Sequence, residues 1–361
     1  PMLFAVCAPG LEPVLLGEIQ ALGLSGHAVA GGVEVPSGDV ARLNLWLRTA
    51  SRVLVRLGDG FRATAFPELV RKASALPWEK YARPGSPVAL RVTCRKSRLY
   101  HSGAVAQRLR AALEARLGTP SGDTLAGGQL FVARLDHDVC TVSADSSGVL
   151  LHQRGYRGPQ AKAPLRETLA AALLLAARWD PATPLCDPLC GSGTIAIEAA
   201  LIAARRAPGL KRSFSFEKWP GFDVRPFQDL RAAARAGERP LAARIEASDQ
   251  DAGAIAAARE NAARADVSGI EIVQRQLSAL LADDGPGLIA CNPPYGVRIG
   301  SDVRRVFRDL AEAMRRRPRW RAAAVIADPP SAAALRWSRL LRTQNGGIPV
   351  DFSVFDPTPA G

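Results

Sequence analysis

Short apolar runs alternate with longer amphipathic segments from residue 163 to residue 328, and this alternation constrains the fold more than any other feature of the chain. Runs of roughly four to eight apolar residues are typical of buried strands, and apolar residues three and four apart are typical of helices. Strands separated by helices pair in parallel. We therefore predict a doubly wound α/β domain, with an antiparallel hairpin at its edge around the Asn-Gly pair of 341–355.

The elements expected in this half follow one another without an internal repeat. The expected helices cover 163–179, 194–206, 252–265 and 302–316, and the expected strands cover 184–190, 243–249, 270–276, 287–295 and 321–328. The residues before 155 have a different order. Residues 4–60 match strand, helix, hairpin, helix and strand, which is the ferredoxin-like order. A second unit is expected to contain helices over 66–76 and 102–118 and strands over 87–96, 129–145 and 148–157.

Composition indicates a globular protein with a polyanionic partner. A chain of 361 residues predicts two or three domains, and its formal net charge of +13 favours nucleic acid because phosphates are attracted to it. We find no apolar stretch of membrane-spanning length and no signal-peptide layout in residues 1–25, so a cytoplasmic location is expected. The six cysteines and four histidines are scattered, so we expect buried, reduced thiols and no metal site. The oligomeric state is not fixed by the sequence.

A glycine loop, DPLCGSGTIAIEAA at 187–200, stands between an expected strand and an expected helix. Gly191 and Gly193 let backbone N–H groups approach a ligand, and the helix N-terminus adds partial positive charge. With Ala196 the loop matches a dinucleotide fingerprint, whereas it lacks the Gly-Lys-Ser/Thr of a nucleotide-triphosphate loop. Asp187 would repel a pyrophosphate. It would attract the ammonium and sulfonium groups of S-adenosyl-L-methionine, which we therefore expect as the cofactor.

The residues that follow the next two strands fit the rest of such a cofactor. A dinucleotide site needs an acidic residue about 20 positions after the loop. Here the next strand-ending acid, Asp249, follows a long insertion at 203–242. We expect Asp249 to accept the ribose hydroxyls, and Gln276 and Leu277 to lie beside the adenine.

The run CNPPY leaves the fourth expected strand through two prolines, which cannot continue a sheet ladder. It should lie beside the methyl group, because open α/β sheets bind ligands at the carboxyl ends of their strands. The exocyclic amine of a nucleobase is a poor nucleophile. If the Asn292 side chain and the Pro293 carbonyl each accept one N–H, the lone pair is turned toward the methyl group. Pro294 stiffens the segment, and Tyr295 can stack on the flipped base.

Together these segments resemble the THUMP-containing class I methyltransferases, which modify the N2 amine of guanine in bacterial 23S ribosomal RNA or in tRNA. The resemblance covers nearly the whole chain. Its segments are APLRETLAAALL, DPLCGSGTIAIEAA, the APGL and FEKW pieces at 207–219, SDQDAGAIAAARENA and NPPYGVRI. It implies a ferredoxin-like subdomain at 1–58, a THUMP RNA-binding domain at 59–155 and a Rossmann-like catalytic domain at 156–361.

The resemblance also implies roles for individual residues. Asp187, Cys190, Gly191 and Gly193 would contact the methionine part of the cofactor, Asp249 its ribose, and Asn292 to Tyr295 the target base. The other expected cofactor contacts are Pro164, Leu165, Leu189, Ser192, Gln250 and Asn292. Arg95, Lys96 and Arg98 lie in RKSRLYHSGAVAQRL, which resembles the RNA-contacting THUMP segment. Relatives often have an aspartate for the adenine amine where this chain has Gln276, so a backbone group or the Gln amide oxygen is expected there.

Several alternatives stay open at this point. In the insertion, Arg212, Phe214, Phe216 and Trp219 either form an RNA-facing wall or pack into the core. A guanine-N2 RNA methyltransferase acting on ribosomal RNA is the favoured function, and a tRNA substrate fits the same chemistry. The competing readings are an adenine-N6 methyltransferase on RNA or DNA, a non-catalytic RNA-binding factor and a nicotinamide dehydrogenase.

Overall fold

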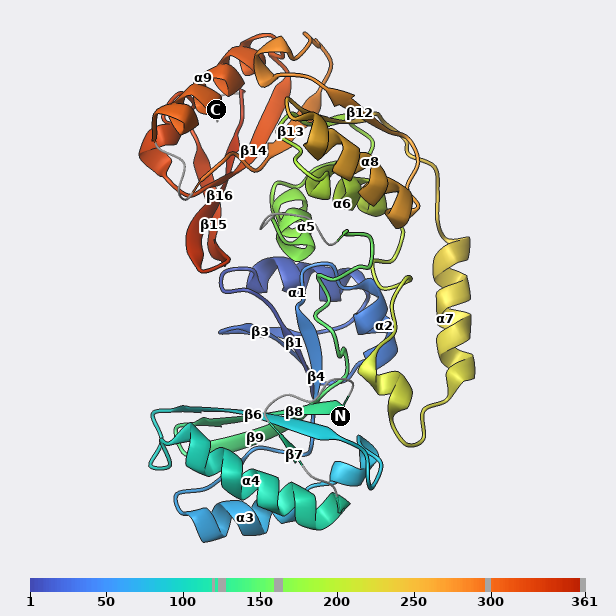
Figure 1. Cartoon of the computed structure of the whole chain (residues 1–361), viewed down its shortest axis with the longest axis vertical. Helices are drawn as coiled ribbons and strands as arrows, with labels where there is room; N and C mark the ends of the chain where they lie inside the picture. Colours follow the sequence, from blue (N-terminus) through green and yellow to red (C-terminus); the bar gives the residue numbers. More distant parts are fainter. Residues whose placement is uncertain (119–120, 123–127, 159–164, 296–299, 358–361) are drawn as a thin grey trace.

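The computed structural model describes residues 1–118, 121–122, 128–158, 165–295 and 300–357, and two β-sheets organise them. In Figure 1 one sheet occupies the lower part of the molecule and the other the upper part. Helices α1 (Glu12–Ala21) and α5 (Glu167–Ala176) pack against each other between the two sheets. Within the described part of the chain, no helix is long and apolar enough to cross a membrane.

The lower sheet is formed by the first 145 residues. Besides α1, its elements in chain order are β1 (Leu3–Val6), β2 (His27–Val29), β3 (Gly32–Val35), α2 (Val40–Trp46), β4 (Arg52–Arg56), β5 (Phe61–Arg62), α3 (Phe66–Ser74), η1 (Trp78–Lys80), β6 (Val88–Arg95), α4 (Ser102–Leu117), β7 (Ser121–Gly122), β8 (Gln129–Asp136) and β9 (Val139–Asp145). The strand order is β2-β3-β1-β4-β9-β8-β6-β7, with β5 also paired to β9. The expected ferredoxin-like order is confirmed, and the pairing of β4 with β9 continues its sheet into the next unit.

The upper sheet is formed by the residues after 184. Its elements are β10 (Leu185–Asp187), α6 (Thr194–Ala203), η2 (Ser215–Lys218), α7 (Val224–Ala236), β11 (Ile245–Asp249), α8 (Ala252–Ala265), β12 (Ile270–Gln274), η3 (Leu277–Ala279), β13 (Gly287–Cys291), α9 (Gly300–Arg315), β14 (Trp320–Ile326), η4 (Pro329–Ala332), β15 (Ser338–Asn345) and β16 (Ile348–Phe355). The strand order is β12-β11-β10-β13-β14-β16-β15. The first five strands are parallel, and β15 and β16 form the expected antiparallel hairpin at the edge.

One hydrophobic core connects the two halves. It includes Leu15 and Ile19 of α1 together with Leu169 and Leu173 of α5, all 0–2% exposed. Burying such a side chain stabilises the fold by about 1.5–3 kcal/mol. Packing of these side chains therefore holds the two halves together, in addition to the covalent connection between them. All six cysteines are free. Five are buried as expected, and Cys94 is partly exposed.

The strand expected over 148–157 is wrong. This segment forms bends and a turn that surround the Arg154 side chain, which is only 3% exposed. Arg154 donates to the carbonyls of Leu151 and Arg48, at 2.8 and 2.6 Å, and pairs with Glu198 of α6. A buried cation needs this many partners. The apolar residues of 148–157 therefore lie beside the buried ion pair of Arg154 and Glu198 and do not form a strand.

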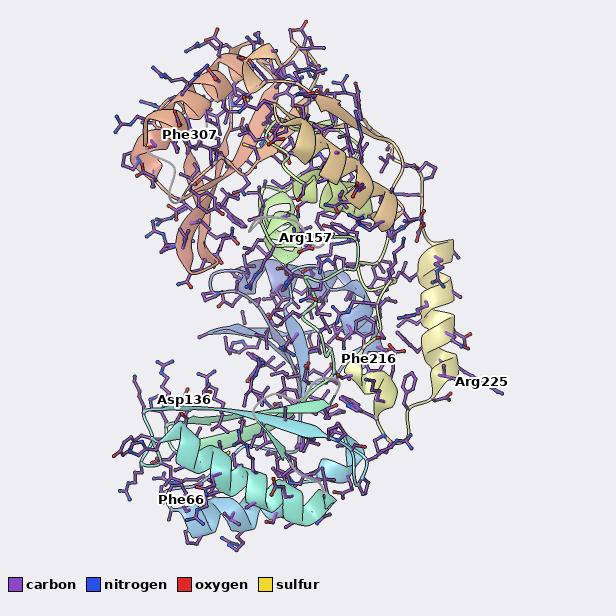
Figure 2. The ribbon with its side chains drawn as sticks, in the orientation of Figure 1. Phe66, Asp136, Arg157, Phe216, Arg225 and Phe307 are labelled. Carbon is purple, nitrogen blue, oxygen red and sulfur yellow. The ribbon has the colours of Figure 1, made fainter. Side chains whose placement is uncertain are left out.

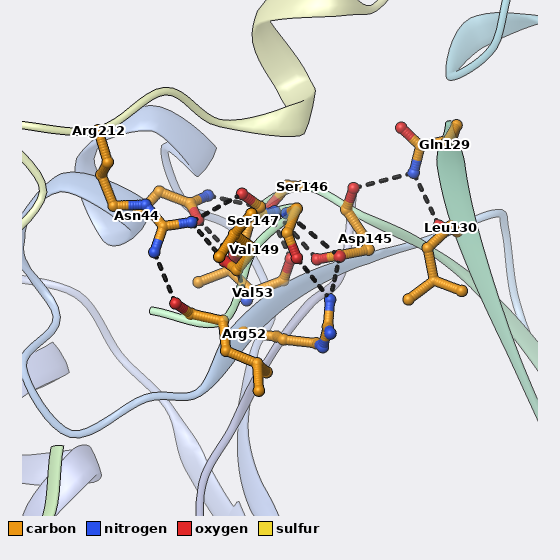
Figure 3. Close-up of polar contacts among 12 residues, drawn as sticks. Asn44, Arg52, Val53, Gln129, Leu130, Asp145, Ser146, Ser147, Val149 and Arg212 are labelled. Atoms are coloured by element: carbon orange, nitrogen blue, oxygen red, sulfur yellow. Dashed lines mark hydrogen bonds and ion pairs between the residues drawn. The ribbon is translucent and has the colours of Figure 1, made fainter. Parts of the chain in front are cut away.

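The RNA-facing wall considered for the insertion is contradicted by the burial of its two phenylalanines, and its partly exposed arginine is held by backbone carbonyls. Figure 3 shows Arg212 beside the buried Asn44–Ser147 pair, and it donates to the carbonyls of Leu150 and Ser147 at 2.7 and 3.2 Å. Phe214 and Phe216 are 2% and 3% exposed. The fourth residue, Trp219, is partly exposed and donates its indole N–H to the Gln129 side chain. The insertion therefore packs against the N-terminal half through these residues.

Candidate active site

Two neighbouring strand ends form the centre of the site. β10 pairs in parallel with β11 on one side and with β13 on the other, so that Cys186 lies opposite both Glu246 and Ile289. Winding of the sheet reverses between β10 and β13, and ligands of open α/β sheets bind at such a point, beyond the carboxyl ends. We call residues 187–193 with Asp249 the glycine corner, and residues 292–295 the proline elbow.

The glycine corner is fixed by its own backbone. Gly191 and Gly193 have φ angles of +51° and +85°, which favour glycine, and the Gly193 N–H donates to the Cys190 carbonyl at 2.7 Å. A Cβ on Gly193 would lie 3.1 Å from the Cβ of Ala258 on α8. A Cβ on Gly191 would meet no atom of the residues that the structure describes within 4 Å. Gly193 therefore lets the loop pack against α8, whereas Gly191 borders open space.

Two carboxylates face this loop. Asp187 is 1% exposed, and burial raises its pKa to about 8, with the charge of Asp249 adding to the rise. Its carboxyl accepts the Leu189 N–H at 3.2 Å. Asp249 accepts the N–H groups of Gly191 and Asp251, each at 3.0 Å. Near neutral pH the ligand-free Asp187 carboxyl is therefore largely protonated, and a cationic ligand bound beside it would favour its ionised form.

Two hydroxyls and one asparagine complete the corner. The buried hydroxyl oxygens of Ser192 and Ser248 have no hydrogen-bond partner in the part of the chain that the structure describes. Asn261 of α8 donates to the Ser192 carbonyl at 2.9 Å and accepts the Gly158 N–H. Our sequence reasoning missed Asn261, because only the fold brings α8 against the loop. The unpartnered hydroxyls are groups that a bound ligand could satisfy.

The proline elbow carries an orphaned acceptor. The Asn292 Oδ1 atom is buried and has no hydrogen-bond partner among the described residues. Burial raises the pKa of Tyr295, and hydrogen bonding with Asn345 and Asn292 counters that rise. Asn345, at the tip of the β15–β16 hairpin, donates to the Tyr295 hydroxyl. The Asn-Gly sequence predicted this hairpin, but it gave no sign that the tip would hold the tyrosine.

A cavity of about 260 Å³ opens beside the elbow. Its lining residues are Pro293, Pro294, Tyr295, Val303, Phe307, Val325, Ile326, Ala327, Asp328 and Ser331. Figure 2 marks Phe307 on α9 in the upper part of the molecule. The glycine corner lies close to this cavity. Burial raises the pKa of Cys291, the residue before the elbow, and the charge of Asp187 in the corner raises it further. The predicted base and methyl-donor positions are thus adjacent strand ends.

The other residues expected near the cofactor are spread along the same edge. Cys190 and Leu277 are buried, Leu189 is partly buried, and Gln250 and Gln276 are exposed after β11 and β12. Leu165 is buried, and its carbonyl accepts a hydrogen bond from Arg157 at 2.8 Å. Arg157, marked in Figure 2, also donates to the Thr194 hydroxyl at 2.9 Å, so it ties the start of α6 to the segment before α5. Pro164 lies outside the described residues.

The residues expected to contact RNA lie on the other sheet. Arg95 ends β6 opposite Asp136, and Arg95, Lys96 and Arg98 are all exposed. Figure 2 marks Asp136 in the lower part of the molecule and Phe307 in the upper part. A ligand that touched both regions would have to be long. Nowhere in the described chain do three or more His, Cys, Asp or Glu side chains form a group that could hold a metal ion.

Comparison with known proteins relates the chain to methyltransferases. A family model described as UPF0020, RMKL-like methyltransferase domain, matches residues 154–340, and a model of the RlmL ferredoxin-like domain matches residues 2–54. The "Putative RNA methyltransferase slr0064" of Synechocystis sp. is 34% identical over 96% of this chain and 94% of its own length. The "Ribosomal RNA large subunit methyltransferase K/L" of Syntrophotalea carbinolica is 35% identical over 99% of this chain, which spans 54% of that relative.

Solved structures of similar fold also carry methyltransferase titles. The structure titled "SMU.472, a putative methyltransferase complexed with SAH" has a TM-score of 0.86 and 29% identity over 100% of this chain and 99% of its own. A Listeria monocytogenes structure titled "predicted N6-adenine-specific DNA methylase" has a TM-score of 0.87 and 34% identity over 98% and 95% of the two chains. The predicted Rossmann-like fold and ferredoxin-like unit are confirmed, and the dehydrogenase alternative is wrong. The chain belongs to the RMKL-like methyltransferase family.

Proposed function

We propose that the protein transfers a methyl group from S-adenosyl-L-methionine to the exocyclic N2 amine of a guanine in large-subunit ribosomal RNA. The observation that carries this proposal is the Oδ1 atom of Asn292, which is buried beside the elbow cavity and has no hydrogen-bond partner among the described residues. A buried acceptor without a partner costs about 1–3 kcal/mol, so a chain that keeps one has a use for it. Two relatives are named as RNA methyltransferases, which supports RNA as the substrate.

The glycine corner fits the cofactor by charge and by space. S-adenosyl-L-methionine would supply an electrophilic methyl group on a positively charged sulfur. Asp187 and Asp249 provide the opposite charge, and the open side of Gly191 leaves room for the ligand. The free hydroxyls of Ser192 and Ser248 can take part in its hydrogen bonds. Gln276 and Leu277, after the third strand of the sheet, would border the adenine.

The elbow positions the target amine. The Asn292 Oδ1 atom and the Pro293 carbonyl each accept one N–H of the amine, which keeps the nitrogen lone pair out of those hydrogen bonds and aimed at the corner. Pro293 and Pro294 hold both acceptors rigidly, and the ring of Tyr295 stacks on the base. The amine proton released by the transfer passes to water. Preorganised acceptors of this kind need no covalent intermediate.

The N-terminal half binds a part of the RNA that is distant from the target base. We propose that residues 1–58 form the ferredoxin-like subdomain, 59–155 a THUMP RNA-binding domain and 156–361 the catalytic domain. The exposed Arg95, Lys96 and Arg98 would contact phosphates of a structured RNA, which must be long enough to reach the elbow.

The second candidate is adenine-N6 methylation, because the Listeria structure carries that title and adenine also presents an exocyclic amine. The protein would be incubated with S-adenosyl-L-methionine and with ribosomal RNA or tRNA from a strain that lacks it. Mass spectrometry of the digested RNA then counts N2-methylguanosine and N6-methyladenosine. We expect N2-methylguanosine in the large-subunit ribosomal RNA, and a loss of about 100-fold or more in rate with Asn292→Ala. Equal methylation by both proteins would rule out the role of Asn292.

A further inference from the structure

Two neighbouring strands leave the upper sheet in the same way. β13 ends at Cys291 and is followed by Asn292-Pro293-Pro294, and β14 ends at Ile326, shortly before Asp328-Pro329-Pro330. The two strands are paired in parallel, with Cys291 opposite Ala324, so both exits lie at the same edge. Pro293, Pro294 and Asp328 all line the cavity beside the elbow. The second exit carries a carboxylate where the first carries an amide.

The carboxylate of Asp328 has a single hydrogen-bond partner within the described part of the chain. Although Asp328 precedes η4, its side chain makes no capping bond to the helix backbone. It accepts a hydrogen bond from the Ser331 hydroxyl, and within the described residues it forms no ion pair with an arginine or lysine. Most other walls of the cavity are apolar, among them Val303 and Phe307. Asp328 is thus an exposed acceptor that is oriented by Ser331, has lone pairs to spare and lines the cavity proposed for the target base.

We propose that Asp328 determines the choice of base by accepting the N1–H of guanine, an inference that rests on the proposed function. A carboxylate can only accept hydrogen bonds. On its Watson–Crick edge guanine has an N1–H donor next to its N2 amine, whereas adenine has an N1 lone pair next to its N6 amine. Asp328 therefore attracts the edge of guanine and repels that of adenine, while Asn292 and Pro293 take the amine itself. Enzymes that flip a base read this edge by such contacts.

The isosteric variant Asp328→Asn tests this inference, because it removes the charge and adds an N–H donor. Ribosomal RNA from a strain lacking the protein serves as substrate, and mass spectrometry counts N2-methylguanosine and N6-methyladenosine. We expect kcat/KM for N2-methylguanosine to fall about tenfold or more, the scale of one good base contact, with unchanged S-adenosylhomocysteine affinity. The share of N6-methyladenosine should rise. Asp328→Ala should show the same fall in kcat/KM for N2-methylguanosine, but no rise in the share of N6-methyladenosine.

Asp302→Asn is the matched control, since Asp302 is an exposed carboxylate of α9 that does not line the cavity. It should behave as the unaltered protein. Unchanged guanine methylation in Asp328→Asn would overturn the inference and leave the proposed function standing. An equal loss of S-adenosylhomocysteine binding and thermal stability would overturn it too, because Asp328 would then serve the fold. If the unaltered protein makes only N6-methyladenosine, the proposed function fails, and the guanine reading fails with it.

Discussion

The glycine corner and the proline elbow lie at adjacent strand ends, yet they present opposite kinds of chemistry. The corner holds two carboxylates, and backbone N–H groups fix both of them. The elbow holds a neutral amide and two prolines, and its key acceptor has no partner within the described chain. A cation is bound by charge, whereas a neutral amine is positioned by a rigid acceptor. Changes in the corner should therefore act on cofactor affinity, and changes in the elbow on turnover.

The largest effect on cofactor affinity is expected for Asp249→Asn. The substitution removes a charge and weakens the bonds from Gly191 and Asp251, and a hydrogen bond to a charged group contributes about 1.5–3 kcal/mol. The Kd for S-adenosylhomocysteine should rise about 100-fold in calorimetry. Asp251→Asn is the control: Asp251 caps α8, and asparagine caps equally well. A similar loss in both variants would contradict the special role of Asp249.

A change in the elbow should show the reverse pattern. Tyr295→Ala removes the proposed stacking surface, and stacking on an aromatic ring contributes about 1–3 kcal/mol per base. We expect kcat/KM for RNA to fall about 30-fold while S-adenosylhomocysteine binding stays the same. Tyr295→Phe keeps the ring and should lose much less. If Tyr295→Ala weakens cofactor binding instead, the division between corner and elbow breaks down.

Two glycines of the corner allow a comparison within one loop. In Gly193→Ala an alanine must adopt a positive φ, and its methyl group also crowds Ala258. The free energy of unfolding should therefore fall by about 2 kcal/mol in thermal or denaturant unfolding. Gly191→Ala meets open space and should cost about 1 kcal/mol from its φ alone. It should nevertheless lose more cofactor affinity, because its methyl enters the ligand's space. Equal affinity losses would argue against that placement.

Local patterns in the sequence predicted the order of the elements, the glycine loop and the elbow, because strand periodicity and turn residues are local properties. What they missed depends on distant partners. In place of the expected strand at 148–157 the chain bends around Arg154, which pairs with Glu198, 44 residues away. Asn345 reaches Tyr295 across 50 residues, and Asp328 joins the elbow only through the pairing of β13 with β14. No spacing rule connects residues that meet only in the folded sheet.

The buried carboxyl of Asp187 predicts a pH dependence of the corner. Its pKa is raised to about 8 from an ordinary 3.8, so between these values the folded protein binds more protons than the unfolded chain. The free energy of unfolding of the ligand-free protein should therefore fall as the pH rises through this window. A cationic ligand favours the ionised carboxyl, so its affinity should rise about tenfold per pH unit up to pH 8. Asp187→Asn should still bind the ligand, but its free energy of unfolding and its ligand affinity should both lose this dependence on pH.

The smallest effect is expected where the elbow meets the β15–β16 hairpin. Asn345 donates to the Tyr295 hydroxyl, and an ordinary hydrogen bond contributes about 0.5–1.5 kcal/mol. Asn345→Ala should therefore lower kcat for RNA about threefold, because the ring keeps its stacking surface but loses its fixed orientation. Cofactor affinity should not change, since Asn345 is not part of the glycine corner. Adding Tyr295→Phe to Asn345→Ala should lower kcat less than Tyr295→Phe does alone, because both changes remove the bond with Asn345 and only the hydrogen bond with Asn292 is lost in addition. Additive losses would mean that the hairpin acts on the elbow by another route.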